Sequence, residues 1–355
     1  MAETARATLG DVAAVAGLSL LRTSEALHGR VRLPGPVALR LSRAVEKLGY
    51  RTPGTVRATH PAAVRIVVPN LTSWFYSQAA SVAQEVLEHH GIHSTIVGLH
   101  QELGQETAPG SGAGRISPLL TRNVHGVLLM GLDLTGTEAR ALLDSGVAVA
   151  GLGQPSEDWD SVGIDDEFAA WSAAQHLLEL GHWNLALLAG TDATMVQRRR
   201  GFLQALAEHD LEAEPDFIVS TATSLEGGYA AMNDLIAERG RPSAVVAACD
   251  DIAFGALKAL HEHGLDVPES LSLVGIDDHP MSSLLGLSTV SQSVPDQAAL
   301  AASLLAERVL AAPGRVPPEH HLLPTTLLAR KSTRRARSPF WAGAARGGHA
   351  AIGTE

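Results

Sequence analysis

The chain has 355 residues, of which 45% are hydrophobic and 18% are charged, and its net charge is −11. This length predicts two or three domains, and the composition argues against a disordered chain. Its single cysteine, Cys249, excludes an intrachain disulfide, and the sequence contains no signal peptide and no apolar run of about 18 residues. We therefore expect a cytoplasmic protein with no membrane segment.

The charge is distributed unevenly along the chain. Residues 1–60 contain nine Lys or Arg and four Asp or Glu side chains, a local excess of five positive charges in an acidic chain. This asymmetry predicts a small basic head on an acidic body. A basic head suits contact with the phosphates of nucleic acid.

Residues 1–50 predict a head of three short helices. In the stretch TLGDVAAVAGLSLLRTSEALHG (8–29), apolar residues recur at helical spacing on both sides of Gly17, which suits a turn with positive φ. Ser19 can cap the helix that follows, and a third periodic stretch ends at Gly49. Two helices joined by such a turn indicate a DNA-binding helix-turn-helix.

A linker and a larger α/β region follow the head. Residues 51–61 contain two prolines and a glycine without periodicity, which predicts a hinge or linker. Beyond it, amphipathic stretches separate short apolar runs at 64–70, 93–98, 125–131, 147–153, 185–190, 243–249 and 271–277. This alternation predicts a core over 62–333 made of two doubly wound parallel-sheet subdomains with a ligand cleft between them. Residues 334–355 lack any period and predict a disordered tail.

Several motifs occur in order along residues 8–333. They are TLGDVAAVAGLS, AVEKLGY, IVVPNLTSWFY, VHGVLLMG, VGIDDEFAAWSAAQHLLELGH, RRRGFLQAL, DDIAFGALKALHEHGLDVPESLSLVGIDD, LSTVSQ and LPTTLLARKST. Through them the chain resembles the lactose/galactose repressor family of bacterial transcription regulators. The resemblance implies a helix-turn-helix head, a hinge and a two-lobed core like that of a periplasmic sugar-binding protein.

The resemblance also implies how the core is organised and what it binds. The family's chain crosses between the lobes three times, so lobe one is expected at 62–161 plus 292–322, and lobe two at 162–291 plus 323–333. Family members work as homodimers on near-palindromic operator DNA, and a small effector in the cleft changes operator affinity. The resemblance implies neither catalysis nor a cofactor.

The resemblance assigns DNA contacts to the head. Phosphate contacts fall on Thr8, Ser19 and Ser24, whose hydroxyls can donate to phosphate oxygens, although Ser19 can equally be a plain helix cap. Two leucines and Glu25 stand at base-reading positions, where the family usually has a polar residue and an arginine. The candidate DNA-binding residues are Thr8, Ser19, Leu20, Leu21, Arg22, Ser24, Glu25, His28 and Arg57.

These departures change what the head can read. Glutamate can accept a hydrogen bond from the N4 amino group of cytosine, whereas leucine can only pack on a group such as a thymine methyl. Arg22 can offset the charge of Glu25 near phosphates. The hinge is about three residues shorter than in relatives, with Thr59 near the family's groove-wedging leucine. A degenerate head that no longer reads sequence is therefore an alternative.

The resemblance places effector contacts in the core. Arg198 can hold ligand hydroxyls or a carboxylate through its planar fork, and Asp277 ends a predicted strand where open α/β sheets bind ligands. Phe75 offers a flat face for a ring, and Trp74, in place of a common proline, can supply another. The candidate effector-binding residues are Trp74, Phe75, Arg198, Cys249, Asp277 and Gln292.

Three family ligand positions differ in this chain. Gly153 stands where an aspartate is common, Thr223 where an aromatic ring often stacks, and Cys249 where an asparagine usually precedes Asp250. The effector class therefore stays open, with a sugar or sugar derivative first and a nucleoside-like or other small polar molecule second.

Other chemistry has little support in the sequence. The histidines at 89–93 and 261–263 lack accompanying residues at metal-ligand spacing, and Cys249 has no base partner in the sequence. We expect no metal site and no catalytic residue. The chain is interpreted as a homodimeric, effector-controlled transcription regulator, most simply a repressor. The alternatives are a small-molecule sensor with a degenerate head and an exported sugar-binding protein, which would need a signal peptide.

Overall fold

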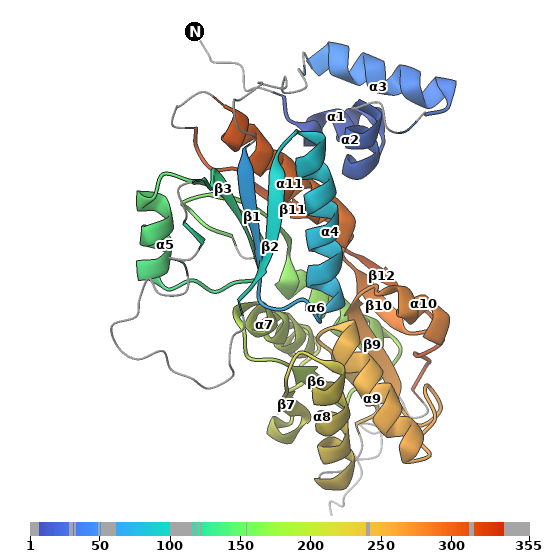
Figure 1. The fold of residues 1–355 in the computed structure, drawn as a ribbon. Helices are drawn as coiled ribbons and strands as arrows, with labels where there is room; N and C mark the ends of the chain where they lie inside the picture. Colours follow the sequence, from blue (N-terminus) through green and yellow to red (C-terminus); the bar gives the residue numbers. More distant parts are fainter. Residues whose placement is uncertain are drawn as a thin grey trace, which may run out of the picture. The chain divides into compact units, whose positions relative to one another are not determined.

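The computed structural model describes residues 7–27, 31, 33–48, 50, 62–99, 116, 119–120, 123–153, 155–238, 242–311 and 316–336. The chain divides into two compact units. Unit 1 comprises Met1–Gly163 and Val294–Leu323, and unit 2 comprises Ile164–Ser293 and Pro324–Glu355 (Figure 1). The chain therefore passes three times from one unit to the other.

Three helices form the head, namely α1 (Leu9–Ala16), α2 (Leu20–Leu27) and α3 (Gly35–Leu48). The first ends at Gly17, whose φ of 64° is the left-handed conformation that glycine adopts without strain. Apolar side chains from α1 and α3 meet in a small core that includes Val12 and Leu41. The predicted turn between α1 and α2 is thus present.

A six-stranded sheet forms the centre of unit 1, in the order β11-β5-β4-β3-β1-β2. Its strands are β1 (Ala63–Val68), β2 (His93–Gly98), β3 (Gly126–Met130), β4 (Ala148–Leu152), β5 (Asp160–Ile164) and β11 (His320–Leu323). The five neighbouring strands β5, β4, β3, β1 and β2 all pair in parallel. Ile66 of β1 lies opposite Ile96 of β2 on one side and Leu128 of β3 on the other. The central strand β3 is buried along its whole length, which explains its unbroken apolar sequence.

Helices cover both faces of the unit 1 sheet (Figure 1). One face packs on α4 (Trp74–His89) and α11 (Val294–Leu310), and the other packs on α5 (Gly136–Asp144). Neighbouring residues of β1 divide between these layers, with Ile66 in the α4 and α11 core and Val67 in the α5 core. This two-sided burial is that of a doubly wound sheet.

Unit 2 contains a second six-stranded sheet, in the order β12-β10-β9-β8-β6-β7. Its strands are β6 (Leu185–Ala189), β7 (Ile218–Ser220), β8 (Ala244–Ala247), β9 (Ser272–Asp277), β10 (Ser288–Ser291) and β12 (Thr326–Leu328). All pairs are parallel except β10 with β12. Val246 of β8 lies opposite Leu187 and Val274, so the apolar centres of three strands are in register.

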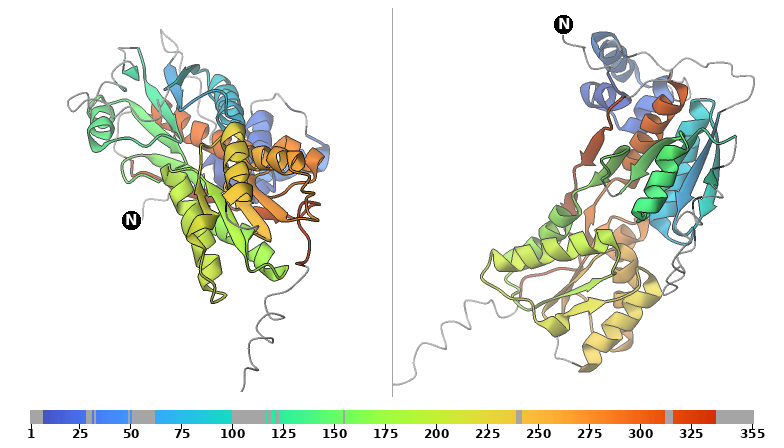
Figure 2. Two further views of the ribbon diagram at one scale, coloured as in Figure 1. Left: turned by 90° about the horizontal axis from the view of Figure 1, so that it is seen from below. Right: turned by 90° about the vertical axis from the view of Figure 1, so that its left-hand side faces the viewer.

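Two pairs of helices cover the unit 2 sheet. One pair is α6 (Asp166–Glu179) with α7 (Ala193–Ala207), and the other is α8 (Leu225–Glu238) with α9 (Asp250–Glu262). The pairs lie on opposite faces, as right-handed crossovers between parallel strands require, and the short α10 (Pro280–Leu285) follows β9 (Figure 2). The helices pack closely because Gly201 brings α7 against the backbone of α6 at Glu167.

The predicted α/β core of two doubly wound, mainly parallel sheets is confirmed, although some strands lie outside the predicted runs. The short or polar strands β5, β7, β10, β11 and β12 have no apolar run long enough to identify them. The antiparallel β12 is an edge strand that the expectation of parallel pairing did not include. None of the helices among the described residues is long and apolar enough to cross a bilayer.

The predicted start of the disordered tail, at residue 334, is too early in the chain. The backbone N–H of Arg334 donates to Ser272 Oγ at 3.1 Å, and its carbonyl accepts from His182 Nε2 at 2.9 Å. The N–H of Ala336 donates to the carbonyl of Leu180 at 2.9 Å. These paired backbone groups make 334–336 part of unit 2, and 337–355 lie outside the described residues.

Candidate functional site: a buried polar network and the head helices

Arg198 is the centre of a polar network inside unit 2. Its side chain projects from α7 and is only 4% exposed. The Nε atom donates to Asp166 Oδ1 at 2.8 Å, and Nη1 donates to the carbonyl of Ala248 at 2.5 Å. Nη1 also lies 3.4 Å from Asp277 Oδ1. Two carboxylates and a carbonyl therefore fix the guanidinium in one orientation.

Asp277 occupies the carboxyl end of β9 in an unusual backbone conformation. Its φ is 131°, a region that residues with a side chain rarely adopt and that costs about 1–3 kcal/mol. The buried Gln292, which follows β10, donates from Nε2 to the same carboxylate oxygen that faces Arg198. Strain of this kind concentrates at ligand-binding sites, which makes Asp277 a candidate ligand contact.

Burial has the largest effect on the pKa values of the carboxyl groups in this network. It raises the pKa of Asp166 and of Asp277 above the ordinary carboxyl value, and the neighbouring Arg198 opposes both shifts. Burial alone would lower the pKa of Arg198, but the attraction of the two carboxylates reverses that effect and raises it. The arginine therefore stays charged, and the charge of the network depends on its carboxyl groups.

A third buried carboxylate, Asp250, lies at the start of α9 and is 1% exposed. It accepts hydrogen bonds from the backbone N–H of His279 at 2.9 Å, from Ser282 Oγ at 2.6 Å and from Thr289 Oγ1 at 2.8 Å. Burial, reinforced by the charge of Asp277, raises the pKa of Asp250 to about 7. Asp250 thus joins α9 and α10 to β10 through one buried group.

In the head, the predicted phosphate contacts Thr8 and Ser19 act as helix caps. Thr8 accepts from the N–H of Asp11 at 3.2 Å, and its hydroxyl donates to the Asp11 carboxylate at 2.8 Å. Ser19 Oγ accepts from the N–H of Arg22 at 3.3 Å, and its side chain remains exposed. Both hydroxyls therefore stabilise helix starts.

The structure corrects one predicted phosphate contact. Ser24 is fully buried, because it lies on the inner face of α2 beside the equally buried Thr23, so its hydroxyl is not presented to solvent. Leu20 and Leu21 are half-buried, and Leu20 packs on the apolar core of the head. Of the remaining candidates on α2, Arg22 is exposed and Glu25 is half-buried. The predicted His28 and Arg57 lie outside the described residues.

Known proteins resemble this chain along most of its length. Residues 174–333 match the family model described as a periplasmic binding protein-like domain. The chain is 30% identical over 349 residues to the HTH-type transcriptional regulator reg1 of Streptomyces lividans, a match that covers 92% of this chain and 97% of that protein. The chain belongs to the lactose/galactose repressor (LacI) family of transcriptional regulators.

Solved structures of this family share the fold of the new regulator. One is the transcriptional regulator CelR in complex with cellobiose, with a TM-score of 0.69 and 26% identity, covering 92% of this chain and all of that one. Another is a LacI-family regulator from Mycobacterium smegmatis, with a TM-score of 0.65 and 28% identity, covering 77% and 99%. Such relatives are named as regulators and not as enzymes.

Four of the predicted effector contacts of this LacI-family regulator lie in unit 2. The structure joins Arg198, Asp277 and Gln292 in one network, and Cys249 precedes α9 next to the carbonyl that receives Arg198. Burial, followed by the charge of Asp277, raises the pKa of the Cys249 thiol well above its ordinary value.

The other two predicted effector contacts, Trp74 and Phe75, lie in unit 1. They are the first residues of α4 and are half-buried at the carboxyl end of β1. The ring of Phe75 meets that of Tyr76 edge to face, with centroids 5.2 Å apart and planes at 88°. Their role in ligand binding stays a prediction.

Sequence reasoning missed two members of the polar network, Asp166 and the carbonyl of Ala248. Asp166 belongs to the pair of aspartates after β5, where an N-cap explains only the first, since Asp165 accepts from the N–H of Phe168. Asp166 has no capping role, and this additional acidic residue was the sequence signal that could have indicated a member of the network. No side-chain pattern could indicate the carbonyl of Ala248, because any residue at this strand end would supply it.

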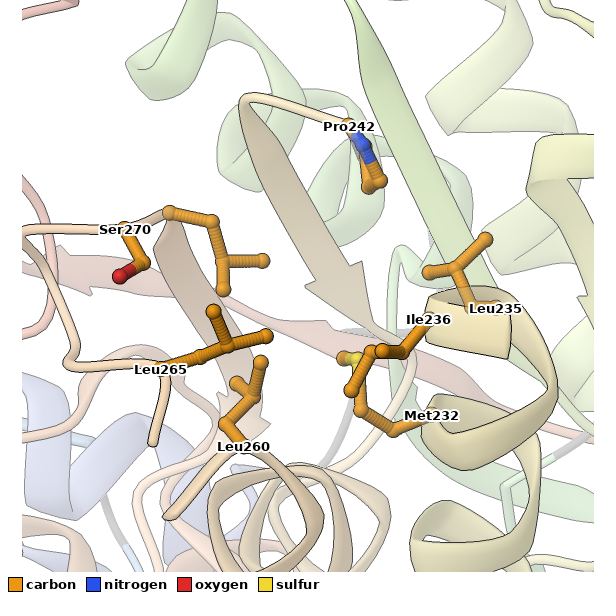
Figure 3. A pocket seen from close by; sticks show the side chains of 8 residues that line it. Met232, Leu235, Ile236, Pro242, Leu260, Leu265 and Ser270 are labelled. Carbon is orange, nitrogen blue, oxygen red and sulfur yellow. The ribbon is translucent and has the colours of Figure 1, made fainter. Parts of the chain in front are cut away.

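An apolar hollow elsewhere in unit 2 is too small to be the effector site. It lies between α8, α9 and the start of β9, lined by residues that include Met232, Leu260 and Leu265 (Figure 3). Its volume is about 20 Å³, whereas an engineered cavity that binds benzene has about 150 Å³. The hollow has room for about one water and offers it few polar partners.

Proposed function

We propose that this LacI-family protein is a DNA-binding repressor whose operator affinity is controlled by a small hydroxylated effector. The observation that carries the proposal is the buried network of Arg198, Asp277 and Gln292 at the carboxyl ends of the unit 2 strands. That edge is where open α/β sheets bind ligands. Fixed donors and acceptors at such an edge suit a ligand with several hydroxyls.

The charge of the network supports an uncharged effector. Arg198 already faces Asp166 and Asp277 and gives a further bond to a carbonyl, so its positive charge is balanced within the protein. A ligand carboxylate or phosphate would add negative charge to a site that already holds two carboxylates. A sugar is the first candidate and a nucleoside the second, and the cellobiose complex of the neighbour CelR favours the sugar.

The regulator is proposed to act on DNA as a homodimer. Two heads of a dimer would contact two half-sites of a near-palindromic operator, as helix-turn-helix dimers do. The exposed Arg22 and the basic surplus of residues 1–60 would supply phosphate contacts. Effector binding would change the spacing of the heads and hence the operator affinity.

A second candidate is a small-molecule sensor whose head no longer reads sequence. Two observations favour it, the half-buried leucines at the base-reading positions of α2 and the buried Ser24. Such a head would bind any duplex through its basic side chains, with strong salt dependence and no preference.

Selection of DNA from a random duplex pool distinguishes the two candidates. The purified full chain is incubated with the pool at about 0.1 M salt, where screening reduces non-specific contacts, and the retained duplexes are sequenced over several rounds. The repressor proposal expects enrichment of a near-palindromic motif, and Arg22→Ala should weaken retention of it. A retained pool that stays random would overturn the proposal in favour of the sensor.

A further inference from the structure

The three head helices belong to the same compact unit as α4 and α11. The head has an apolar core of its own, which includes Val12, Leu41 and Tyr50. Beyond this core, α1 and α2 both contact α11, and α2 also contacts α4. The head therefore rests on the two helices that cover one face of the unit 1 sheet.

The outer side of α11 is covered by the head. Every residue from 297 to 306 is buried, although a single sheet face can bury only one side of a helix. Leu305 lies on the sheet side, since a Cβ at Gly126 of β3 would lie 3.1 Å from its Cδ1. Leu300 lies about 140° around the helix from Leu305 and is nevertheless only 5% exposed. A Cβ at Gly10 of α1 would lie 3.7 Å from Leu300 Cδ1, so α1 is in van der Waals contact with this leucine.

Two leucines of α2 take part in the same contact. Leu20 and Leu21 pack on the apolar cluster that α4 and α11 form with the unit 1 sheet. Leu20 also packs on the core of the head, whereas Leu21 is absent from that core as far as the structure describes it. The apolar contact of Leu21 is therefore with the body of unit 1. These are the leucines to which the family resemblance gives base-reading positions.

Docking and base reading need the same side of α2. A recognition helix reads bases by entering the major groove, where its side chains must reach the base edges directly. Leu20 and Leu21 cannot pack on the α4 and α11 cluster and lie in the groove at the same time. Leucine also has no donor or acceptor for a base edge but is well suited to an apolar contact. Docking thus gives a physical reason for two leucines where relatives carry polar residues.

We infer that the head docks on α4 and α11 through Leu20 and Leu21, and that this contact competes with DNA for the same side of α2. The inference rests on the proposed DNA binding, although docking itself requires no DNA. DNA binds only the fraction of molecules whose head is released, so the measured affinity is reduced by that fraction. By linkage, bound DNA opposes docking to the same extent.

Crosslinking of the full chain measures docking in the absence of DNA. Gly10→Cys combined with Leu300→Cys places two thiols at the contact, where a short, reducible bismaleimide can join them, and the native Cys249 is buried. Ser42→Cys combined with Leu300→Cys is the matched control, because Ser42 is exposed on α3. We expect the first pair to crosslink about fivefold or more faster than the control pair, because docking raises the local concentration of one thiol near the other. A mixed-sequence duplex should slow this reaction.

Fluorescence anisotropy with the same mixed-sequence duplex at low salt measures the competition. Leu300→Gln weakens docking from the α11 side, adds no charge and leaves every candidate DNA contact unchanged. Its dissociation constant should be lower than that of the unmodified chain by about threefold or more. Leu322→Gln, at an exposed position of β11, should leave the dissociation constant unchanged. The crosslinked double-cysteine protein should bind the duplex more weakly, and reduction of the linker should restore binding.

The outcomes separate docking from DNA recognition. The inference is overturned if the Gly10→Cys pair crosslinks no faster than the control pair, or if neither Leu300→Gln nor reduction of the linker raises affinity for the duplex. If Leu300→Gln does not fold, the crosslinked protein decides the second point alone. A random pool after selection would count against the repressor proposal, but it would leave both measurements intact because they use a duplex of mixed sequence.

Discussion

The two sheets of this regulator have the same architecture but carry opposite chemistry at their carboxyl ends. In unit 2 the edge carries a charged, buried and hydrogen-bonded network around Arg198 and Asp277. In unit 1 the α5 side of the edge is open, with glycines and an indole around an empty space. The same fold thus carries a buried ionic network at the strand edge of one unit and a hollow of about 240 Å³ at that of the other.

Removing the arginine should have the largest effect, because the unit 2 edge depends on charge balance. Arg198→Met leaves Asp166 and Asp277 buried beside each other without their cation. We expect a loss of roughly 3–5 kcal/mol in the free energy of unfolding, measured by urea denaturation. Arg199→Met, at an exposed position of the same helix, should change it by less than about 0.5 kcal/mol. Equal losses in the two variants would show that the network does not stabilise unit 2.

A smaller effect is expected from crowding the same edge. In Gly275→Ala the new Cβ would lie 2.0 Å from Asp250 Oδ1, so the buried carboxylate must move away from its three donors. We expect destabilisation of about 1–3 kcal/mol in urea unfolding. Gly136→Ala on α5 is the control, because its Cβ meets nothing within 4 Å. If Gly275→Ala is as stable as the control, Asp250 does not lie as close to the backbone of Gly275 as the structure shows.

The buried carboxyl group of Asp250 should also make the free energy of unfolding depend on pH. Burial raises the pKa of Asp250 from 3.8 to about 7, so the folded state holds this proton more tightly than the unfolded state does. The resulting stabilisation is complete below pH 3.8 and is lost as the pH rises through about 7, with a slope of at most about 1.4 kcal/mol per pH unit for one proton. Unfolding free energies measured between about pH 5 and about pH 8 should therefore fall, and Asp250→Asn should flatten the decline. An unchanged slope in that variant would assign the dependence to other groups.

The smallest effect is expected in the head, because Glu25 is a single, half-exposed charge on α2. Glu25→Ala removes a negative charge from α2, so affinity for non-specific duplex should rise a few-fold at low salt, and preference at one base pair should relax. Fluorescence anisotropy at several salt concentrations measures the first effect, and repeated selection measures the second. Glu46→Ala on α3, an exposed acidic position outside α2, is the matched control for charge alone. An unchanged selection profile would mean that Glu25 does not read a base.

The sequence predicted the fold well where apolar periodicity is strong. The buried strands β3, β6, β8 and β9 coincide with apolar runs, and the turn at Gly17 has the positive φ that the pattern required. The strands β5, β7, β10, β11 and β12 were missed because they are short or carry polar residues. The first crossing lies at 163/164, where the resemblance placed it at 161/162.

The contacts within the candidate site were harder to predict from the sequence than the fold. Arg198, Asp277 and Gln292 were expected from motifs, but their mutual contacts depend on residues far apart in the chain. The burial of Ser24 was missed although Leu20 and Leu27 flank it at helical spacing on the face that packs on the head core, because a hydroxyl side chain was not read as an inward-facing residue. The hollow beside Trp159 has no sequence signature, because residues from two separate loops and α5 line it together.

The most direct test of effector control is the linkage between ligand and DNA. Affinity of the full chain for its selected duplex is measured by anisotropy with and without cellobiose, glucose or adenosine. Control through the unit 2 network predicts that at least one compound shifts the dissociation constant by about fivefold or more, and that Asp277→Asn abolishes the shift. A dissociation constant that no compound changes, or a shift that persists in Asp277→Asn, would contradict it.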